Sequence, residues 1–197
     1  MTEIEVDRLL VVRAQEGDEV AFGLLVKRHR GRLMRQVMRQ VANPADAEEI
    51  VQETFFKAYK ALASFRGDAR FYTWLYKISH NTVGAFRAGE ARRTQFVVEQ
   101  RPDWFNQMRS QSEGELGTPE AILASRQTAN AIDRTLTTMP YEFSNTLVLR
   151  EIEEFSYAEI AMIMDCPENT VRSRLYRARE MIDEALRAQS KPTRGPS

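Results

Sequence analysis

The stretch from Ser156 to Arg179 constrains the fold of this 197-residue chain more than any other feature. Ala161 is a small residue at which two helices can cross closely, and Asp165-Cys166-Pro167 predicts a tight turn directly after the first helix. Apolar residues recur at helical spacing on both sides of the turn: Ile160, Met164, Val171 and Leu175. This combination predicts a helix-turn-helix with these four side chains facing inward.

The second helix of this motif then presents a basic, polar face to its surroundings. The residues expected on that face are Arg172, Ser173, Tyr176, Arg177 and Arg179. The planar guanidinium group of arginine bonds guanine O6 and N7 together, which the point charge of lysine does not do. We therefore predict duplex DNA reading by this helix; the alternative is a helical hairpin with a solvated basic face.

Most of the remaining chain contains residues that are typical of helix starts and ends. Asp18 and Asn43 are expected N-terminal caps, the latter with Pro44 in the first turn of its helix. Pro140 separates two helices, of which the second is expected to run to about Phe155. Ser156 with Glu159 forms a capping box for the next helix. The predicted fold class is all-α, with two small helical domains joined by a flexible linker. Their expected bounds are 1–93 and 119–190, with the linker over 94–118 (Trp104 and Phe105 as possible anchors) and a disordered tail over 191–197.

Composition excludes several classes of protein. The single cysteine permits no intrachain disulfide, no apolar run is long enough for a membrane span, and the acidic N-terminus does not resemble a signal peptide. There is no glycine-rich phosphate loop, and the two histidines show no metal-ligand spacing. We expect no catalytic residues, no metal and no cofactor, and an enzyme is disfavoured.

The N-terminal module contains five aromatic residues between positions 65 and 76. Core packing accounts for Phe71 and Trp74. Cationic and polar side chains are interleaved around the same segment, and this mixture is typical of single-stranded DNA binding. They are Arg66, Arg70, Lys77, His80 and Asn81.

The third expected helix, Pro44 to about Leu62, is acidic in its first two turns. The helix dipole explains the acids from Asp46 to Glu49, whereas Gln52 and Glu53 lie beyond the first turn and suit a basic protein partner. His29, with basic neighbours on both sides, is expected on the surface.

Two long motifs resemble a known family. Asp46-Ala-Glu-Glu-Ile-Val-Gln-Glu-Thr-Phe-Phe-Lys-Ala-Tyr, Ser64-Phe-Arg-Gly-Asp and Phe71-Tyr-Thr-Trp-Leu-Tyr-Lys-Ile resemble region 2 of extracytoplasmic-function sigma factors, closest to the sigma-E-like members. Phe155-Ser-Tyr-Ala-Glu-Ile-Ala, Cys166-Pro and Thr170-Val-Arg-Ser-Arg-Leu-Tyr-Arg-Ala-Arg-Glu are similar to their region 4. The likeness covers nearly the whole chain except the linker.

The resemblance implies an alternative sigma factor that binds bacterial core RNA polymerase in the cytoplasm and directs promoter-specific transcription, in an envelope or other stress response. Region 2 would contact the clamp helices of the largest polymerase subunit, and region 4 the flap. An anti-sigma factor, membrane-anchored, would hold the protein inactive. The residues that the resemblance assigns to the polymerase contact are Asp46, Glu49, Gln52 and Glu53.

The resemblance also divides promoter recognition between the two modules. A loop over Ser64–Asp68 would hold a base flipped from the −10 element, with Lys77 and Asn81 contacting the unpaired strand. The −35 element would be read as duplex in the major groove. The assigned residues are Ser64, Phe65, Arg66, Lys77 and Asn81 for −10, and Arg172, Ser173, Tyr176 and Arg177 for −35.

Two other functions remain open from the residues alone. One is a helix-turn-helix regulator that binds duplex DNA without polymerase, and the other is an adaptor whose helices bind only proteins. The segment from Phe65 to Asn81 distinguishes a sigma factor from these alternatives, because a simple regulator needs no loop that captures a single strand.

Overall fold

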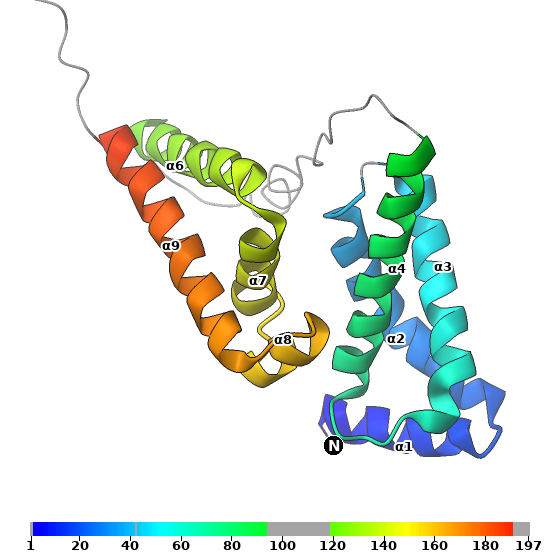
Figure 1. Ribbon diagram of the computed structural model, residues 1–197. Helices are drawn as coiled ribbons and strands as arrows, with labels where there is room; N and C mark the ends of the chain where they lie inside the picture. Colours follow the sequence, from blue (N-terminus) through cyan, green and yellow to red (C-terminus); the bar gives the residue numbers. More distant parts are fainter. Residues whose placement is uncertain (1, 42, 94–118, 191–197) are drawn as a thin grey trace, which may run out of the picture. The chain divides into compact units, whose positions relative to one another are not determined.

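The computed structural model describes residues 2–41, 43–93 and 119–190, which form helices and short connections (Figure 1). The chain divides into two compact units, Met1–Pro102 and Asp103–Ser197. No strand occurs in the described residues, and the all-α prediction is confirmed. The predicted linker with Trp104 and Phe105, and the predicted tail, lie outside the described residues.

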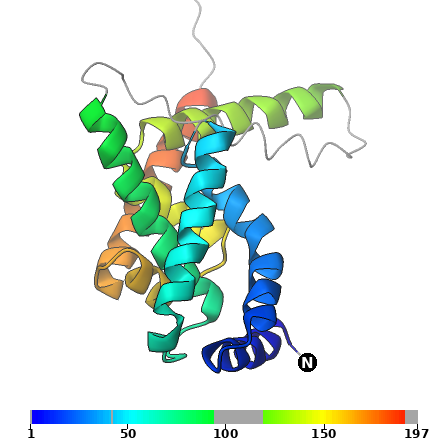
Figure 2. The same ribbon diagram turned by 90° about the vertical axis from the view of Figure 1, so that its right-hand side faces the viewer.

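The first unit contains four α-helices and one short 3-10 helix. They are α1 (Glu3–Gln15), α2 (Glu19–Met38), α3 (Pro44–Ala61), η1 (Leu62–Ser64) and α4 (Phe71–Arg93). Helices α2, α3 and α4 lie side by side, and α1 crosses the end of this bundle at which η1 leads from α3 towards α4 (Figures 1 and 2).

The helix starts in this unit follow from local hydrogen bonding. Asp18 accepts a hydrogen bond from the Ala21 backbone N–H at 3.1 Å, and Asn43 accepts one from Ala45 at 2.9 Å with Pro44 in the first turn. Both predicted caps are confirmed. The backbone bond from Ala21, followed by the side-chain bond from Arg13, lowers the pKa of Asp18.

The core of the first unit is formed by the apolar sides of α2, α3 and α4, which pack against one another. Leu25, Leu33 and Val37 of α2 are fully buried, as are Leu75 and Tyr76 of α4 within about 1%. The apolar side of α3 is also buried, at Ile50, Val51, Phe55 and Ala58, and so is Leu62 of η1. Burying side chains of this size stabilises the fold by about 1.5–3 kcal/mol each.

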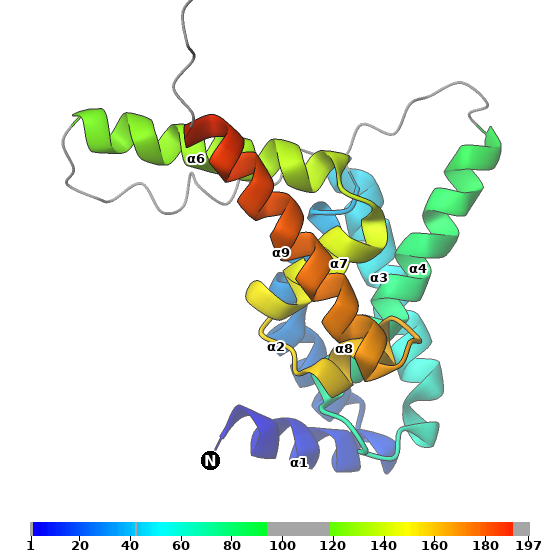
Figure 3. The ribbon, with the colours of Figure 1, turned by 60° about the vertical axis from the view of Figure 1, so that its left-hand side comes forward.

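The second unit contains α6 (Pro119–Thr138), α7 (Tyr141–Glu151), α8 (Tyr157–Ile163) and α9 (Glu168–Ser190). The long α9 packs against α6, α7 and α8, as Figure 3 shows from another side. The helix expected to run to about Phe155 ends four residues earlier, at Glu151, because the chain then turns through Glu154 at a left-handed φ of 59°.

Candidate nucleic-acid interface

Helices α8 and α9 form the predicted helix-turn-helix. Ser156 and Glu159 cap α8 reciprocally, the Glu159 N–H donating to the Ser156 hydroxyl at 3.3 Å and the Ser156 N–H to the Glu159 carboxylate at 2.9 Å. In the turn, Asp165 has a φ of 49°, a left-handed conformation that aspartate tolerates better than most residues. This local geometry fixes the start of α9 relative to α8.

The apolar prediction for this motif is confirmed at three positions out of four. Ile160, Val171 and Leu175 are buried to 1% exposure or less. Met164 is half-buried, and its sulfur accepts a hydrogen bond from the Thr146 hydroxyl at 3.1 Å. The thioether therefore serves a polar contact with α7 at the margin of the core.

The four residues predicted to read duplex DNA are all exposed and lie together on α9. Arg172, Ser173, Tyr176 and Arg177 are at helical spacings of one, four and five, and Tyr176 is 63% exposed. The guanidinium of Arg172 lies 6.0 Å from the ring centre of Tyr157, and its Nη2 is 4.0 Å from Glu168 Oε2. The start of α9 thus presents two arginines and a tyrosine on one accessible face.

Arg179, which the sequence places on the same face, has a structural role as well. Its Nη2 lies 2.6 Å from Oε1 of Glu151 on α7, and this hydrogen bond, opposed by partial burial, raises the pKa of Arg179. Arg174 similarly contacts the turn, with Nη1 3.7 Å from Cys166 Sγ. Four arginines lie between positions 172 and 179, and two of them, Arg174 and Arg179, contact other parts of the motif or α7. Arg172 and Arg177 are therefore the arginines on the reading face.

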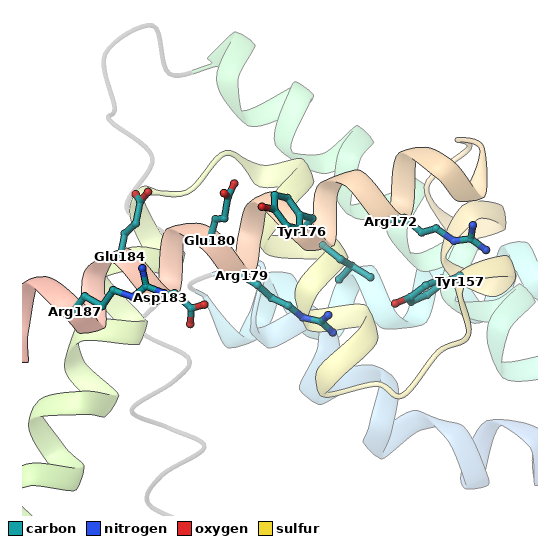
Figure 4. Close-up of a pocket in the computed structure, with 9 residues that line it drawn as sticks. Tyr157, Arg172, Tyr176, Arg179, Glu180, Asp183, Glu184 and Arg187 are labelled. Carbon is teal, nitrogen blue, oxygen red and sulfur yellow. The ribbon is translucent and has the colours of Figure 1, made fainter.

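An open groove of about 580 Å³ runs along α9 beside Tyr157 (Figure 4). Arg172 and Arg179 line the first half, and the second half is mostly acidic, with Glu180, Asp183 and Glu184 followed by Arg187. Because carboxylates repel phosphates, the first half is the part of this surface that favours a DNA backbone. In the sequence, the arginines up to Arg179 precede the carboxylates from Glu180 to Glu184. Because α9 is one continuous helix, both groups lie along the same groove.

In the first unit, the predicted −10 loop begins at Ser64, the last residue of η1. Ser64 and Arg66 are exposed, whereas Phe65 is half-buried with its ring centre 4.8 Å from that of Trp74 and 6.1 Å from that of Phe71. The Phe65 ring is thus engaged with α4 and fixes the loop. Ser64 and Arg66 are the loop residues of the prediction that face outward.

Gln15, at the end of α1, also holds this loop and was not identified from the sequence. Its side-chain Nε2 donates hydrogen bonds to the backbone carbonyls of Leu62 and Phe65, both at 2.9 Å. The two donors of one amide therefore attach α1 to both ends of the Leu62–Phe65 turn. No sequence pattern reveals a contact between residues about 50 positions apart.

Lys77 and Asn81 lie four residues apart on α4, and hence on the same side of the helix. Asn81 is exposed and Lys77 half-buried. The ring contacts of Phe65 with Trp74 connect the loop to the first turns of the same helix. The structure therefore attaches the loop to the helix on which the predicted strand-binding residues lie.

The prediction that His29 is a surface residue is wrong. Its side chain is only 13% exposed, its Nε2 lies 2.9 Å from Asp7 Oδ2, and its ring centre is 5.5 Å from those of Phe71 and Tyr72. Burial alone raises the pKa of Asp7, but hydrogen bonds and charge from His29 and Arg28 lower it overall. The imidazole thus joins α1 to the aromatic side of α4.

The acidic side of α3 is accessible. Glu49, Gln52 and Glu53 are exposed and Asp46 is half-buried. Two exposed aromatic residues, which the sequence analysis did not single out, continue this side: Phe56 at 53% and Tyr59 at 47%. Phe56 lies four residues after Gln52, and Tyr59 lies three after Phe56; this helical spacing is the signal that would have identified them.

No three His, Cys, Asp or Glu side chains gather as metal ligands in the part of the chain that the structure describes. Within those same residues, every helix is too short or too polar to cross a membrane.

Comparison with known proteins shows a likeness along almost the entire chain. Family models of sigma-70 region 2 and sigma-70 region 4 match residues 25–93 and 129–182. The ECF RNA polymerase sigma-E factors of Salmonella typhimurium and Escherichia coli are each 41% identical over 186 residues, covering 94% of this chain and 97% of theirs. The corresponding protein of Haemophilus influenzae is 39% identical over 94% of this chain and 98% of its own.

Solved structures agree with this likeness. CnrH, in complex with the cytosolic domain of CnrY, has a TM-score of 0.64 and 26% identity, covering 94% of this chain and 99% of that chain. The sigma factor RpoE of Bartonella quintana, in complex with the anti-sigma factor NepR, shares the fold at a TM-score of 0.61 and 21% identity, over 84% and 96% of the two chains.

Proposed function

Because the chain belongs to the extracytoplasmic-function family of RNA polymerase sigma factors, we propose that it binds bacterial core RNA polymerase and directs promoter-specific initiation. The observation that carries this function is the presence of both sigma regions, in order, in a chain 41% identical to sigma-E factors over 94% of its length. It acts as an initiation factor rather than an enzyme, without metal or cofactor, in the cytoplasm where promoters and polymerase are found.

The N-terminal domain, 1–93, binds polymerase through the exposed side of α3. Asp46, Glu49, Gln52 and Glu53 supply charge and hydrogen bonding for a basic surface such as the clamp helices of the largest subunit. Phe56 beside them supplies apolar area; its ring lies 4.1 Å from Lys60 Nζ. Protein interfaces typically combine aromatic residues at the centre of the patch with a polar rim.

The same domain captures the unpaired −10 strand. Ser64, Phe65 and Arg66 form the pocket for a flipped base, Phe65 by anchoring the loop, while Lys77 and Asn81 bind the adjoining strand. Unstacking a base costs a few kcal/mol, which contacts in a preformed loop offset. The hydrogen bonds from Gln15 and the ring contacts of Phe65 support this role because they hold the loop in place before DNA arrives.

The C-terminal domain, 119–190, reads the −35 element as duplex through the first half of α9, and it also binds the polymerase flap. The linker, 94–118, joins the two domains and the tail, 191–197, follows them. Two modest DNA sites on one chain gain from effective concentration once polymerase fixes their separation. The residues proposed to read −35 are Arg172, Ser173, Tyr176 and Arg177.

A regulatory partner completes the proposal. CnrH, 26% identical, was solved bound to the cytosolic domain of CnrY. The RpoE sigma factor of Bartonella quintana was solved bound to the anti-sigma factor NepR. We infer that an anti-sigma factor, membrane-anchored, holds this chain inactive and releases it in an envelope or other stress response.

Run-off transcription tests the proposal. Purified core polymerase is incubated with fragmented genomic DNA of the source bacterium, with and without the chain, and transcript 5′ ends are mapped. We expect starts that depend on the chain and share −35 and −10 elements. Duplex binding by the chain alone, without new transcripts, would instead favour a simple helix-turn-helix regulator.

A matched pair of variants tests the polymerase surface. Glu53→Lys on α3 should weaken core binding in a competition assay against the unmodified chain. Glu16→Lys, an equal charge change at an exposed residue just after α1, should leave it unchanged. Equal effects of the two variants would contradict the assignment of this surface.

A further inference from the structure

The function proposed above does not use the buried charged cluster between α1 and α2. Asp7 is a carboxylate of α1 that is only 8% exposed, and two successive residues of α2 meet it. Arg28 Nε lies 3.0 Å from Asp7 Oδ1, and His29 Nε2 lies 2.9 Å from Asp7 Oδ2. Removing a carboxylate from water is costly, and apolar residues in place of such a pair often stabilise a fold equally well. What hydrogen bonds add to an apolar contact is a fixed distance and direction.

Of the two partners of Asp7, His29 is the more shielded from water. Its side chain is 13% exposed against 33% for Arg28, so its bond to the carboxylate is screened less. Because an ionised carboxylate only accepts hydrogen bonds, the His29 Nε2 donates this one. Burial raises the pKa of Asp7, but His29, and to a lesser degree Arg28, lower it overall. His29 is thus the principal polar link between α2 and α1.

The same imidazole belongs to a closed chain of contacts that includes the −10 loop. Its ring centre lies 5.5 Å from that of Phe71, which in turn lies 6.1 Å from that of Phe65 in the loop. Gln15 of α1 donates to the Phe65 carbonyl at 2.9 Å. Asp7 and Gln15 are eight residues apart on α1, a rise of about 12 Å. The hydrogen bond between Asp7 and His29 completes the chain, which holds Phe65 through both its carbonyl and its ring.

The apolar contacts of α1 do not fix its position as closely. Leu10, Val11 and Ala14 are buried, but hydrophobic contact has no preferred direction. A small shift of α1 along its own axis keeps these side chains buried. The same shift moves the Gln15 amide away from the carbonyls that it binds, and a hydrogen bond weakens steeply with distance and angle. Polar contacts elsewhere on α1 therefore decide whether Gln15 is in place.

We propose that His29 is a positioning residue for capture of the −10 strand, because its hydrogen bond to Asp7 fixes α1 where Gln15 holds the loop. This inference rests on the proposed function, since the loop is where the flipped base would lie. With a side chain that is 13% exposed, His29 acts through α1 and not by touching DNA.

Two substitutions at position 29 separate the hydrogen bond from the ring. His29→Gln keeps a donor, because the amide Nε2 is the same number of bonds from the backbone as the imidazole Nε2, but it removes the ring. His29→Phe keeps a ring beside Phe71 and removes the donor. Ile50→Val is the control for a general loss of stability, because Ile50 is a buried residue of α3 outside the closed chain of contacts. Thermal melts confirm that each variant is folded.

Opening of a mapped promoter is measured by 2-aminopurine fluorescence at −10, with holoenzyme that contains the full chain. We expect His29→Phe to lower the opening equilibrium by about 5-fold or more, because a hydrogen bond to a charged group is one of the stronger kinds. His29→Gln and Ile50→Val should open the promoter nearly as the unmodified chain does. In a chain that already carries Gln15→Ala, His29→Phe should lower opening no further, because both residues act on the same loop.

Three results would overturn the inference. The first is unchanged opening with His29→Phe. The second is a loss with His29→Gln as large as that with His29→Phe, since the ring would then be what matters. The third is a double variant whose loss is the product of the two single losses, since the two residues would then act independently.

Two further outcomes have a defined reading. If His29→Phe does not fold, Asp7→Asn replaces it in the cycle with Gln15→Ala, because it removes the charge at the other end of the same hydrogen bond. If holoenzyme with the unmodified chain opens no promoter at all, the proposed function fails instead.

Discussion

Replacement of Gln15 by alanine tests whether α1 positions the −10 loop. The Gln15 amide donates two hydrogen bonds of 2.9 Å, to the carbonyls of Leu62 and Phe65. A hydrogen bond in a folded protein contributes about 0.5–1.5 kcal/mol, so this partly exposed pair is worth about 1–2 kcal/mol to the order of the loop. If strand capture requires the ordered loop, the equilibrium for promoter opening should fall by about 5- to 30-fold.

The assay is the fluorescence of 2-aminopurine placed at the −10 element in complexes with holoenzyme. Glu16→Ala, at the adjacent exposed residue, serves as the control and should open the promoter as the unmodified chain does. Core polymerase affinity should be the same for all three proteins, because Gln15 does not lie on the acidic side of α3. Opening by Gln15→Ala within a factor of two of the unmodified chain would refute the reasoning.

Three predictions concern stability. Glu154→Gly should raise the free energy of unfolding by about 1 kcal/mol in urea titrations, because the φ of 59° at this position is unfavourable for residues other than glycine. A decrease would show that the Glu154 side chain stabilises the fold by more than its backbone conformation costs. Burial raises the pKa of Asp7, but His29 and Arg28 lower it overall, so the Asp7 carboxylate should stabilise the fold fully above about pH 4–5 and lose this effect as the pH falls through the lowered pKa. Asp7→Asn should therefore flatten the acid side of the curve of unfolding free energy against pH. An unaltered acid side would contradict the assignment. Ser79→Ala should lower the free energy of unfolding by about 1–3 kcal/mol, because the buried Gln36 amide, whose Nε2 has no partner, then also loses the hydrogen bond to its oxygen. Adding Gln36→Met should restore most of that loss. Equal melting temperatures for the single and the double variant would contradict the account.

Local features of this fold were predictable because they depend on neighbouring residues. The caps at Asp18, Asn43 and Ser156 follow from a side chain within three residues of the N–H that it accepts from. The left-handed turn at Asp165 follows from the tolerance of aspartate for that conformation. The all-α fold and the helix-turn-helix are confirmed for the same reason, since they depend on spacing within single helices.

Features that depend on contacts across the bundle were not predictable. Three basic neighbours suggested an exposed His29, yet the imidazole meets Asp7 of α1 and two rings of α4. Arg179 shares the spacing of the reading face but is paired with Glu151, which lies 28 residues earlier. Gln15 had no local signal at all. In each case the deciding partner lies on another helix, and one sequence does not state which helices meet.

The helix after Pro140 was predictable from the sequence, but its early end at Glu151 was not. The prediction that the helix after Pro140 runs to about Phe155 is wrong by four residues. Instead, Phe155 is buried and its backbone N–H donates to the Leu149 carbonyl at 3.0 Å, while its own carbonyl accepts from Arg150 at 2.9 Å. Burial of one aromatic side chain therefore outweighs continuation of the helix for a few residues.

Pre-opened promoter templates test the central claim, that the first domain captures an unpaired strand and the second reads intact duplex. Asn81→Ala and Arg177→Ala holoenzymes are compared on a mapped promoter and on the same promoter with a mismatched bubble at −10. We expect the bubble to restore most of the opening lost by Asn81→Ala. Arg177→Ala should keep its loss of −35 discrimination, about 1–3 kcal/mol for one bidentate base contact, on both templates. Equal rescue of both variants by the bubble, or of neither, would contradict this division of roles.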